Sequence, residues 1–267
     1  MKIACTTLAC PTWDLDTIVR RFKEYGYEGL DFRGLRMEME LWKMPEFTTD
    51  LTQSVRKVAQ SGLPVTAFSS SARMFAKDAA TRQKHLDEVT AYAGLCRAFS
   101  APMIRVFGGP LEGTPRDQAI EMAAAALAVM ARAVGEGITL VVETHDEWIE
   151  SKHLAAVLKL VNLPNVKALW DLHHPYRMLG ETPRQTYDSI GKWVASTHLK
   201  DSRKLPDGKH RYCLGGRGDV PMGEMVSLLR QGGYDGYLTL EWEKRWIPDL
   251  EEPEVALPQY AAYMKSL

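Results

Sequence analysis

Ile138-Thr-Leu-Val-Val-Glu143 is a short apolar run that stops on a residue able to bind a metal ion, and the same pattern recurs three times downstream. The other runs are Val166-Lys-Ala-Leu-Trp-Asp171, Ala195-Ser-Thr-His198 and Tyr237-Leu-Thr-Leu-Glu241. Such β-branched and apolar runs are typical of buried strands. A carboxylate at the end of a buried strand is destabilising unless something pairs with it, and a divalent cation pairs well with several carboxylates and one imidazole. The sequence therefore predicts one divalent metal ion, Mn or Mg, bound by Glu143, Asp171, His198 and Glu241.

The remainder of the chain alternates strand-like and helix-like segments. We expect four earlier strands at residues 3–8, 28–32, 64–69 and 102–107. We expect helices at residues 14–26, 49–61, 79–99, 116–135, 151–161, 184–193, 223–231 and 253–264. Eight strand–helix units favour a parallel sheet, and crossovers of this length predict an α/β fold, a single-domain (β/α)8 TIM barrel over residues 1–267. An open doubly wound sheet is the alternative, but no Gly-x-Gly-x-x-Gly turn follows the first strand.

The barrel prediction also places the four metal-competent residues together. In such barrels the active site lies at the C-terminal ends of the strands. The strands that end near Glu143, Asp171, His198 and Glu241 are consecutive, so their ends should form one continuous arc.

Composition argues against several classes of partner. The net charge of −1 over 267 residues gives no support for binding nucleic acid or a membrane surface. No apolar run approaches the roughly 20 residues needed to cross a bilayer, and the first residues do not look like a signal peptide. The four cysteines form no CxxC pair, so we expect reduced, inert thiols in a cytoplasmic protein. The oligomeric state stays open, with a homo-oligomer among the possibilities.

Four motifs carry a family resemblance. They are Glu143-Thr-His145, Asp171-Leu-His-His174, His198-Leu-Lys-Asp-Ser202 and Gly233-Tyr-Asp-Gly-Tyr-Leu-Thr-Leu-Glu241. Together they resemble the xylose-isomerase-like TIM barrels of sugar (phosphate) isomerases and epimerases. That family includes D-tagatose 3-epimerase, hydroxypyruvate isomerase and inosose dehydratase, with endonuclease IV as a distant relative.

The resemblance implies roles for individual residues. It implies that Glu143 and Glu241 move protons at the substrate carbon as well as binding the metal. It implies that His174, three positions after the metal Asp171, holds the substrate. The epimerases also carry an arginine shortly after the metal histidine, and here Arg203 and Lys204 compete for that position.

Position along the strands suggests further candidates. His145 and Lys200 each lie two residues beyond a predicted ligand, so they point to the same side if the strand continues. His145 is a candidate general base, or a loop histidine. Lys200 is a candidate for binding an anionic substrate oxygen, or a partner for Asp201 or Glu241. His173 and His174 should point in opposite directions on an extended chain, and His174 is the preferred one.

Three loop features have both a functional and a structural interpretation. Trp13 after the first strand either stacks on a sugar or anchors the packing, and Arg33 after the second strand is similarly ambiguous. The basic segment 201–221 is either a lid that contacts an anion or a solvated loop. Within it, Gly215-Gly-Arg-Gly218 forms either an anion-binding nest or a turn into the next helix.

These residues favour an enzyme that acts on a small keto sugar or hydroxy-keto acid through a metal-stabilised enediolate. Proton return at the neighbouring carbon gives isomerisation, and return to the opposite face gives epimerisation. The alternative is a lyase, dehydratase or decarboxylase that uses the same intermediate. An endonuclease IV-like phosphodiesterase is less favoured because the chain has only seven histidines and no basic balance. A non-catalytic binding barrel is also less favoured.

Overall fold

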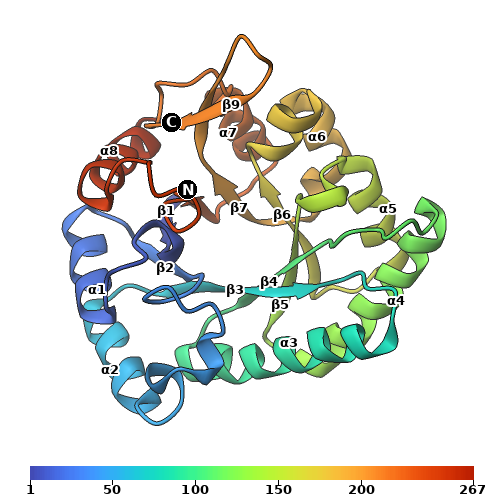
Figure 1. Ribbon diagram of the computed structural model, residues 1–267, viewed down its shortest axis with the longest axis horizontal. Helices are drawn as coiled ribbons and strands as arrows, with labels where there is room; N and C mark the ends of the chain where they lie inside the picture. Colours follow the sequence, from blue (N-terminus) through green and yellow to red (C-terminus); the bar gives the residue numbers. More distant parts are fainter.

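Eight parallel strands close on themselves in the order β1-β10-β7-β6-β5-β4-β3-β2 in the computed structural model, which describes residues 1–267 (Figure 1). The barrel strands are β1 (Lys2–Thr6), β2 (Gly29–Phe32), β3 (Val65–Arg73), β4 (Met103–Phe107), β5 (Thr139–Glu143), β6 (Val166–Asp171), β7 (Val194–Leu199) and β10 (Tyr237–Leu240). Because β1 pairs with both β2 and β10, the TIM-barrel prediction is confirmed and the open-sheet alternative is wrong.

A ring of helices surrounds the barrel (Figure 1). The helices are α1 (Leu15–Glu24), α2 (Leu51–Ser61), α3 (Ala79–Phe99), α4 (Arg116–Val134), α5 (Ser151–Val161), α6 (Pro183–Ile190), α7 (Met222–Gln231) and α8 (Pro253–Ser266). Local sequence sets several of their ends. The Asp14 side chain accepts a hydrogen bond from the Thr17 N–H at the start of α1, and α2 ends at Gly62, whose φ is +72°.

Some element boundaries differ from the expected ones. The first strand ends at Thr6 because residues Thr7–Ala9 form a 3-10 turn, whereas β3 continues to Arg73. The helix expected over residues 184–193 stops at Ile190, and a 3-10 turn, Gly191–Trp193, completes it. Glu241 lies one residue after β10, so the carboxylate follows the strand rather than ending it.

Outside the barrel, an aromatic cluster packs β2 and β3 against the 3-10 turn Pro45–Phe47 and the end of α3. It consists of Phe32, Phe47, Phe68 and Phe99, all buried. The Phe32 and Phe68 rings stack at 5.3 Å, and Phe99 meets both rings edge-on at 5.7 Å. Because successive strand residues alternate between faces, Asp31 and Ser69 beside these phenylalanines are free to face the barrel interior.

The basic segment 201–221 contains structure that the sequence analysis did not predict. Strands β8 (Asp201–Lys204) and β9 (His210–Cys213) form an antiparallel hairpin. Its turn contains Pro206-Asp207-Gly208, and Gly208 has a φ of +84°. The expectation of a plain loop is therefore wrong for residues 201–213.

The glycine-rich stretch after this hairpin wraps a carboxylate of the same chain. Asp201 accepts hydrogen bonds from the N–H groups of Gly216 and Gly218. The nest expected at residues 215–218 is therefore filled by Asp201.

Two further expectations concern the whole chain. All four cysteines are free thiols. None of the helices has the length and apolarity that a bilayer crossing requires.

Candidate metal centre and active site

The four predicted ligands converge inside one end of the barrel. Glu143 ends β5, Asp171 ends β6, His198 lies in β7 and Glu241 follows β10. All four are buried, and one ligand atom from each lies within 4.8 Å of the others. The Nδ1 atom of His198 is 3.1 Å from Oε1 of Glu143 and 3.3 Å from Oε1 of Glu241. The structure thus brings together all four side chains that the sequence singled out.

The donor set fits a hard divalent cation. Ligand atoms about 2.1 Å from one ion in octahedral geometry lie about 3.0 Å from each other, close to the separations around His198. Three carboxylates and one imidazole suit Mg or Mn more than a structural zinc site. Oε2 of Glu143 is buried and has no hydrogen-bond partner, so this carboxylate has unused acceptor capacity. Glu143, Asp171, His198 and Glu241 could therefore hold one ion.

Lys200 supplies positive charge to the same cluster. Its ammonium group is fully buried, lies 2.6 Å from Oδ2 of Asp171 and hydrogen-bonds to Glu241. It also lies 3.3 Å from Oε1 of Glu243. Burial favours the neutral amine, but Asp171 and Glu241 raise the pKa of Lys200 well above its usual value. The two carboxylates therefore favour the charged form of Lys200 next to two of the four candidate ligands.

Electrostatics also sets the protonation of the candidate ligands. Burial favours neutral imidazole, but the carboxylates of Glu241 and Glu143 raise the pKa of His198 well above its usual value. Burial and Glu241 oppose the ionisation of Glu143, yet His198 and Arg105 hold its pKa well below its usual value. Because the ligating nitrogen must be unprotonated, a cation bound here would displace one of the two N–H protons of charged His198.

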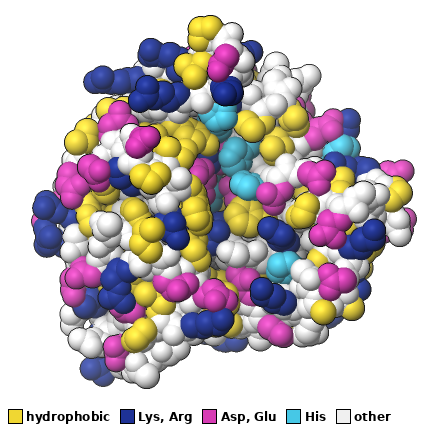
Figure 2. Space-filling view, viewed as in Figure 1, with side chains coloured by type: hydrophobic (Ala, Val, Ile, Leu, Met, Phe, Trp, Pro, Cys, Tyr) yellow, Lys and Arg dark blue, Asp and Glu magenta, His cyan; other side chains and the backbone are white.

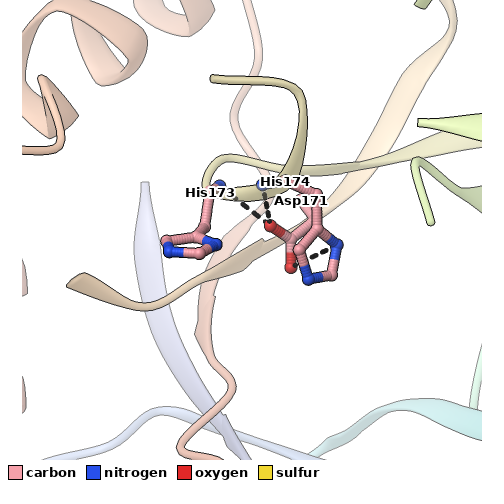
Figure 3. A group of neighbouring side chains, drawn as sticks. All are labelled: Asp171, His173 and His174. Carbon is pink, nitrogen blue, oxygen red and sulfur yellow. Dashed lines mark hydrogen bonds and ion pairs between the residues drawn. The ribbon is translucent and has the colours of Figure 1, made fainter. Parts of the chain in front are cut away.

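Two histidines lie on opposite sides of the Asp171 carboxylate (Figure 3). Its Oδ1 atom accepts the backbone N–H groups of His173 and His174, which fixes the carboxylate at the end of β6. His173 faces Ser202 through Nε2, and His174 faces the Thr144 carbonyl through Nδ1. The expectation that the two rings diverge is confirmed. Burial lowers the pKa of His174 to about 4, so the ring is neutral at neutral pH. Because Nδ1 faces a carbonyl oxygen, it carries the one proton of the ring and leaves Nε2 unprotonated.

His145 is oriented by its neighbour in the chain. Its Nδ1 lies 2.8 Å from Oδ1 of Asp146, whose other oxygen accepts the Gly109 N–H. Burial opposes protonation, but this hydrogen bond raises the pKa of His145. The ring centroid lies 4.9 Å from that of His174, so both imidazoles belong to one wall of the site.

Histidines line a hollow in the face shown in Figure 2, with acidic side chains visible beside them. This hollow lies over the centre of the barrel as drawn in Figure 1. Ring contacts of 4.9, 5.8 and 5.0 Å link His145, His174, His173 and His210 in that order. His210 comes from β9, so the hairpin contributes to the same wall.

Three charged residues of the site were not predicted from the sequence. Arg105 of β4 is fully buried, with Nε 3.4 Å from Oε2 of Glu143 and its guanidinium 3.7 Å above the Phe107 ring. Asp31 of β2 faces His198, and Glu243 contacts Lys200. A charge inside an apolar strand was the available signal, as in Gly29-Leu-Asp-Phe32 and Met103-Ile-Arg-Val-Phe107.

Trp13, Arg203, Lys204 and Arg33 make their observed contacts with groups other than the four candidate ligands. Trp13 is in the hydrophobic core, as its packing interpretation expects. Arg203 and Lys204 are exposed on β8, and Arg203 donates to the Arg217 carbonyl. Arg33 is buried and donates to the Ser71 hydroxyl. Contacts of Trp13 and Arg203 with a substrate stay predictions.

This barrel, with metal-competent side chains at the ends of its strands, defines a recognised class of protein. A family model described as xylose isomerase-like TIM barrel matches residues 19–267. The chain belongs to that family, and the resemblance read from its motifs is confirmed. No curated protein matches the chain.

Solved structures with the same fold share little sequence with the chain. The probable 3-DHS dehydratase AsbF from Bacillus anthracis is 17% identical, with a TM-score of 0.79 over 99% of both chains. The 3-keto-D-glucoside 4-epimerase YcjR from E. coli is 16% identical, with a TM-score of 0.80 over the full length of both. The IolI protein with a bound zinc atom is 15% identical, with a TM-score of 0.84 over 100% of this chain and 97% of that one. At these identities the similarity shows the fold alone.

Proposed function

We propose that the protein is a metal-dependent isomerase or epimerase of a small keto sugar or hydroxy-keto acid. The observation that carries the proposal is the convergence of Glu143, Asp171, His198 and Glu241 within 4.8 Å at one end of the barrel. A bound Mn or Mg ion would polarise the substrate carbonyl and stabilise the negative charge of an enediolate. The 3-keto-glucoside epimerase with the same fold supports this class of substrate.

In the proposal, the two glutamates move the proton. One carboxylate removes the proton from the carbon next to the carbonyl, and the electron pair of that bond forms the enediolate. The same or the other glutamate returns a proton, either to the neighbouring carbon or to the opposite face. Glu143 and Glu241 both lie beside Nδ1 of His198, at 3.1 and 3.3 Å, so they flank the same point of the site.

Other side chains would bind and orient the substrate. We assign hydrogen bonding to Nε2 of His174, which makes no bond within the protein. The Lys200 ammonium, already shared by Asp171 and Glu241, would attract a substrate oxygen that carries negative charge. His145 is the alternative general base if neither glutamate moves the proton, because Asp146 holds its Nδ1 and leaves Nε2 available.

A lyase or dehydratase is the second candidate, and the His145–Asp146 pair favours it. An imidazole held by a carboxylate can donate a proton to a departing hydroxyl, which converts the enediolate into an unsaturated product and water. AsbF, a probable dehydratase with the same fold, supports this alternative.

The deciding experiment is a screen of keto sugars and keto acids with Mn²⁺ or Mg²⁺, followed by proton NMR in D2O. We expect solvent deuterium to appear at the carbon next to the carbonyl, and the product identifies isomerase, epimerase or lyase. Absence of exchange with every compound, in protein shown to bind the metal, would contradict the proposal.

A further inference from the structure

A buried carboxylate from the other side of the barrel faces the metal centre. Asp31 lies on β2, which is separated from β7 by β1 and β10. It is 1% exposed, and its Oδ1 atom has no hydrogen-bond partner. Its Oδ2 atom accepts the Ser69 hydroxyl at 3.1 Å and lies 3.5 Å from Nε2 of His198. Asp31 is not one of the four candidate ligands.

The surroundings of Asp31 leave one ionisable partner for its charge. A buried carboxylate is strongly destabilising unless it is hydrogen-bonded or paired. His198 is the only basic side chain within 4.0 Å of Asp31. Arg33, two residues along the chain, is directed to Ser71 instead. The buried Asp31 carboxylate therefore has Nε2 of His198 as its one basic partner.

The two nitrogens of His198 face different groups. Nδ1 points at the carboxylates of Glu143 and Glu241, whereas Nε2 points at Asp31. A hydrogen bond on one ring nitrogen decides which nitrogen carries the proton and which offers a lone pair. With the proton on Nε2, the lone pair of Nδ1 is directed into the group of candidate ligands.

We propose that Asp31 is a positioning residue that holds His198 as the Nε2–H tautomer, so that Nδ1 is available to bind the metal ion. The proposal rests on the metal centre of the proposed function. Ser69 holds Asp31 in turn, so the chain of contacts runs from β3 through β2 to β7. Carboxylates that orient a ligating histidine in this way contribute to metal affinity without touching the ion or the substrate.

Mn²⁺ titration of the full-length protein, read by the EPR signal of free Mn²⁺, tests the proposal. We expect Asp31→Ala to weaken Mn²⁺ binding by roughly 10- to 100-fold. Asp31→Asn keeps the size and one acceptor, so it should fold and lie between Asp31→Ala and the wild type. Ser69→Ala, which only loosens Asp31, should weaken binding by about two- to fivefold.

Asp201→Asn is the matched control, because Asp201 is also 1% exposed but accepts only the backbone N–H groups of Ser202, Gly216 and Gly218, none of which belongs to a candidate ligand. Its Mn²⁺ affinity should stay within about twofold of the wild type, the scatter expected without an altered contact. A second readout is the imidazole N–H proton resonance in Mg²⁺-loaded protein. The Nε2–H signal of His198 should appear at low field in the wild type and move upfield in Asp31→Asn.

The outcomes separate this inference from the proposed function. Folded Asp31→Asn and Asp31→Ala variants that both bind Mn²⁺ as tightly as the wild type would overturn the role of Asp31 alone. If Asp31→Ala does not fold, an unchanged affinity and an unchanged resonance in Asp31→Asn overturn it equally. A wild-type protein that binds no Mn²⁺ removes both proposals. Weaker Mn²⁺ binding in the variants, without turnover of any keto compound by the wild type, would support the role of Asp31 and contradict the proposed reaction.

Discussion

The two halves of the barrel use their buried residues differently. Around β2 and β3, four phenylalanines pack with ring centroids 5.3 to 6.2 Å apart, outside the barrel. At the ends of β5, β6, β7 and β10, the buried residues are carboxylates, an imidazole and an ammonium group. Apolar packing stabilises the fold, whereas converging like charges are tolerated only where they bind something. We infer that the aromatic cluster of the first half contributes to stability, whereas the charged cluster of the second half contributes to the chemistry.

This division between the two halves is not complete, because two charged residues of the first half contact candidate ligands of the second half. Asp31 from β2 faces His198, and Arg105 from β4 faces Glu143. Each of them contacts a candidate ligand that belongs to the other half. Asp31 therefore approaches His198 from across the barrel, whereas Arg105 approaches Glu143 from the neighbouring strand.

The largest expected effect tests the aromatic half. Phe68→Ala should lower the free energy of unfolding by about 3–5 kcal/mol, because it leaves a cavity beside Phe32 and Phe99. Urea unfolding measures the loss, and the exposed Leu160→Ala variant serves as a control that should change little. Folded Phe68→Ala should still bind Mn²⁺ normally. Lost metal affinity without lost stability would break the division between the halves.

The second effect tests the chemical half. Glu143→Gln and Glu241→Gln should each reduce turnover by roughly 100-fold, because the amide oxygen still binds metal but the side chain no longer accepts a proton. Deuterium exchange at the substrate carbon should fall in parallel. Glu88→Gln is the matched control: Glu88 is a buried glutamate that accepts the Ser71 N–H, and its variant should remain active. Near-normal exchange in both metal-saturated active-site variants would make His145 the first candidate for the base.

A smaller effect concerns the hairpin. If Arg203 and Lys204 attract an anionic substrate, replacing both with Gln should weaken its binding by up to about fivefold and leave a neutral analogue unchanged, since exposed charges contribute little. Parallel titrations with a keto acid and a neutral keto sugar measure the difference. Equal effects on both ligands would mean that Arg203 and Lys204 do not attract an anionic substrate and that β8 is only a solvent-exposed strand.

The same contrast explains what the sequence could predict. The four candidate ligands were identifiable because each ends or follows an apolar run, and the barrel topology then brings the ends together. Asp31 and Arg105 could not be assigned to the site, because the sequence of a short strand does not show whether a single charged residue faces into the barrel or away from it. Which face is inward depends on the register of the closed barrel, and hydrophobic period alone does not fix it.

The hairpin was missed for a different reason. The pairing of Arg203 with Arg211 joins residues on either side of a turn, and neither strand has an apolar face that repeats every second residue. The turn itself was readable, since Pro206-Asp207-Gly208 is a strong turn sequence. A turn signal flanked by polar strands indicates where the chain reverses, but it does not show that the flanking residues pair with each other.

An effect of similar size concerns the stability of the first helix. Asp14 caps α1, and the hydrogen bond from the Thr17 N–H holds the pKa of this carboxyl below its usual value. Asp14→Ala should therefore cost about 1 kcal/mol of unfolding free energy at pH 7. Because the folded pKa is depressed, the contribution is complete above the unfolded pKa near 3.9 and disappears as the pH falls through the folded value. Urea unfolding at pH 7 and at about pH 2.5 should show the difference between variant and wild type shrinking at acid pH. A difference that is the same at both pH values would mean that the cap acts through its shape and not through its charge, since protonation would then leave it intact.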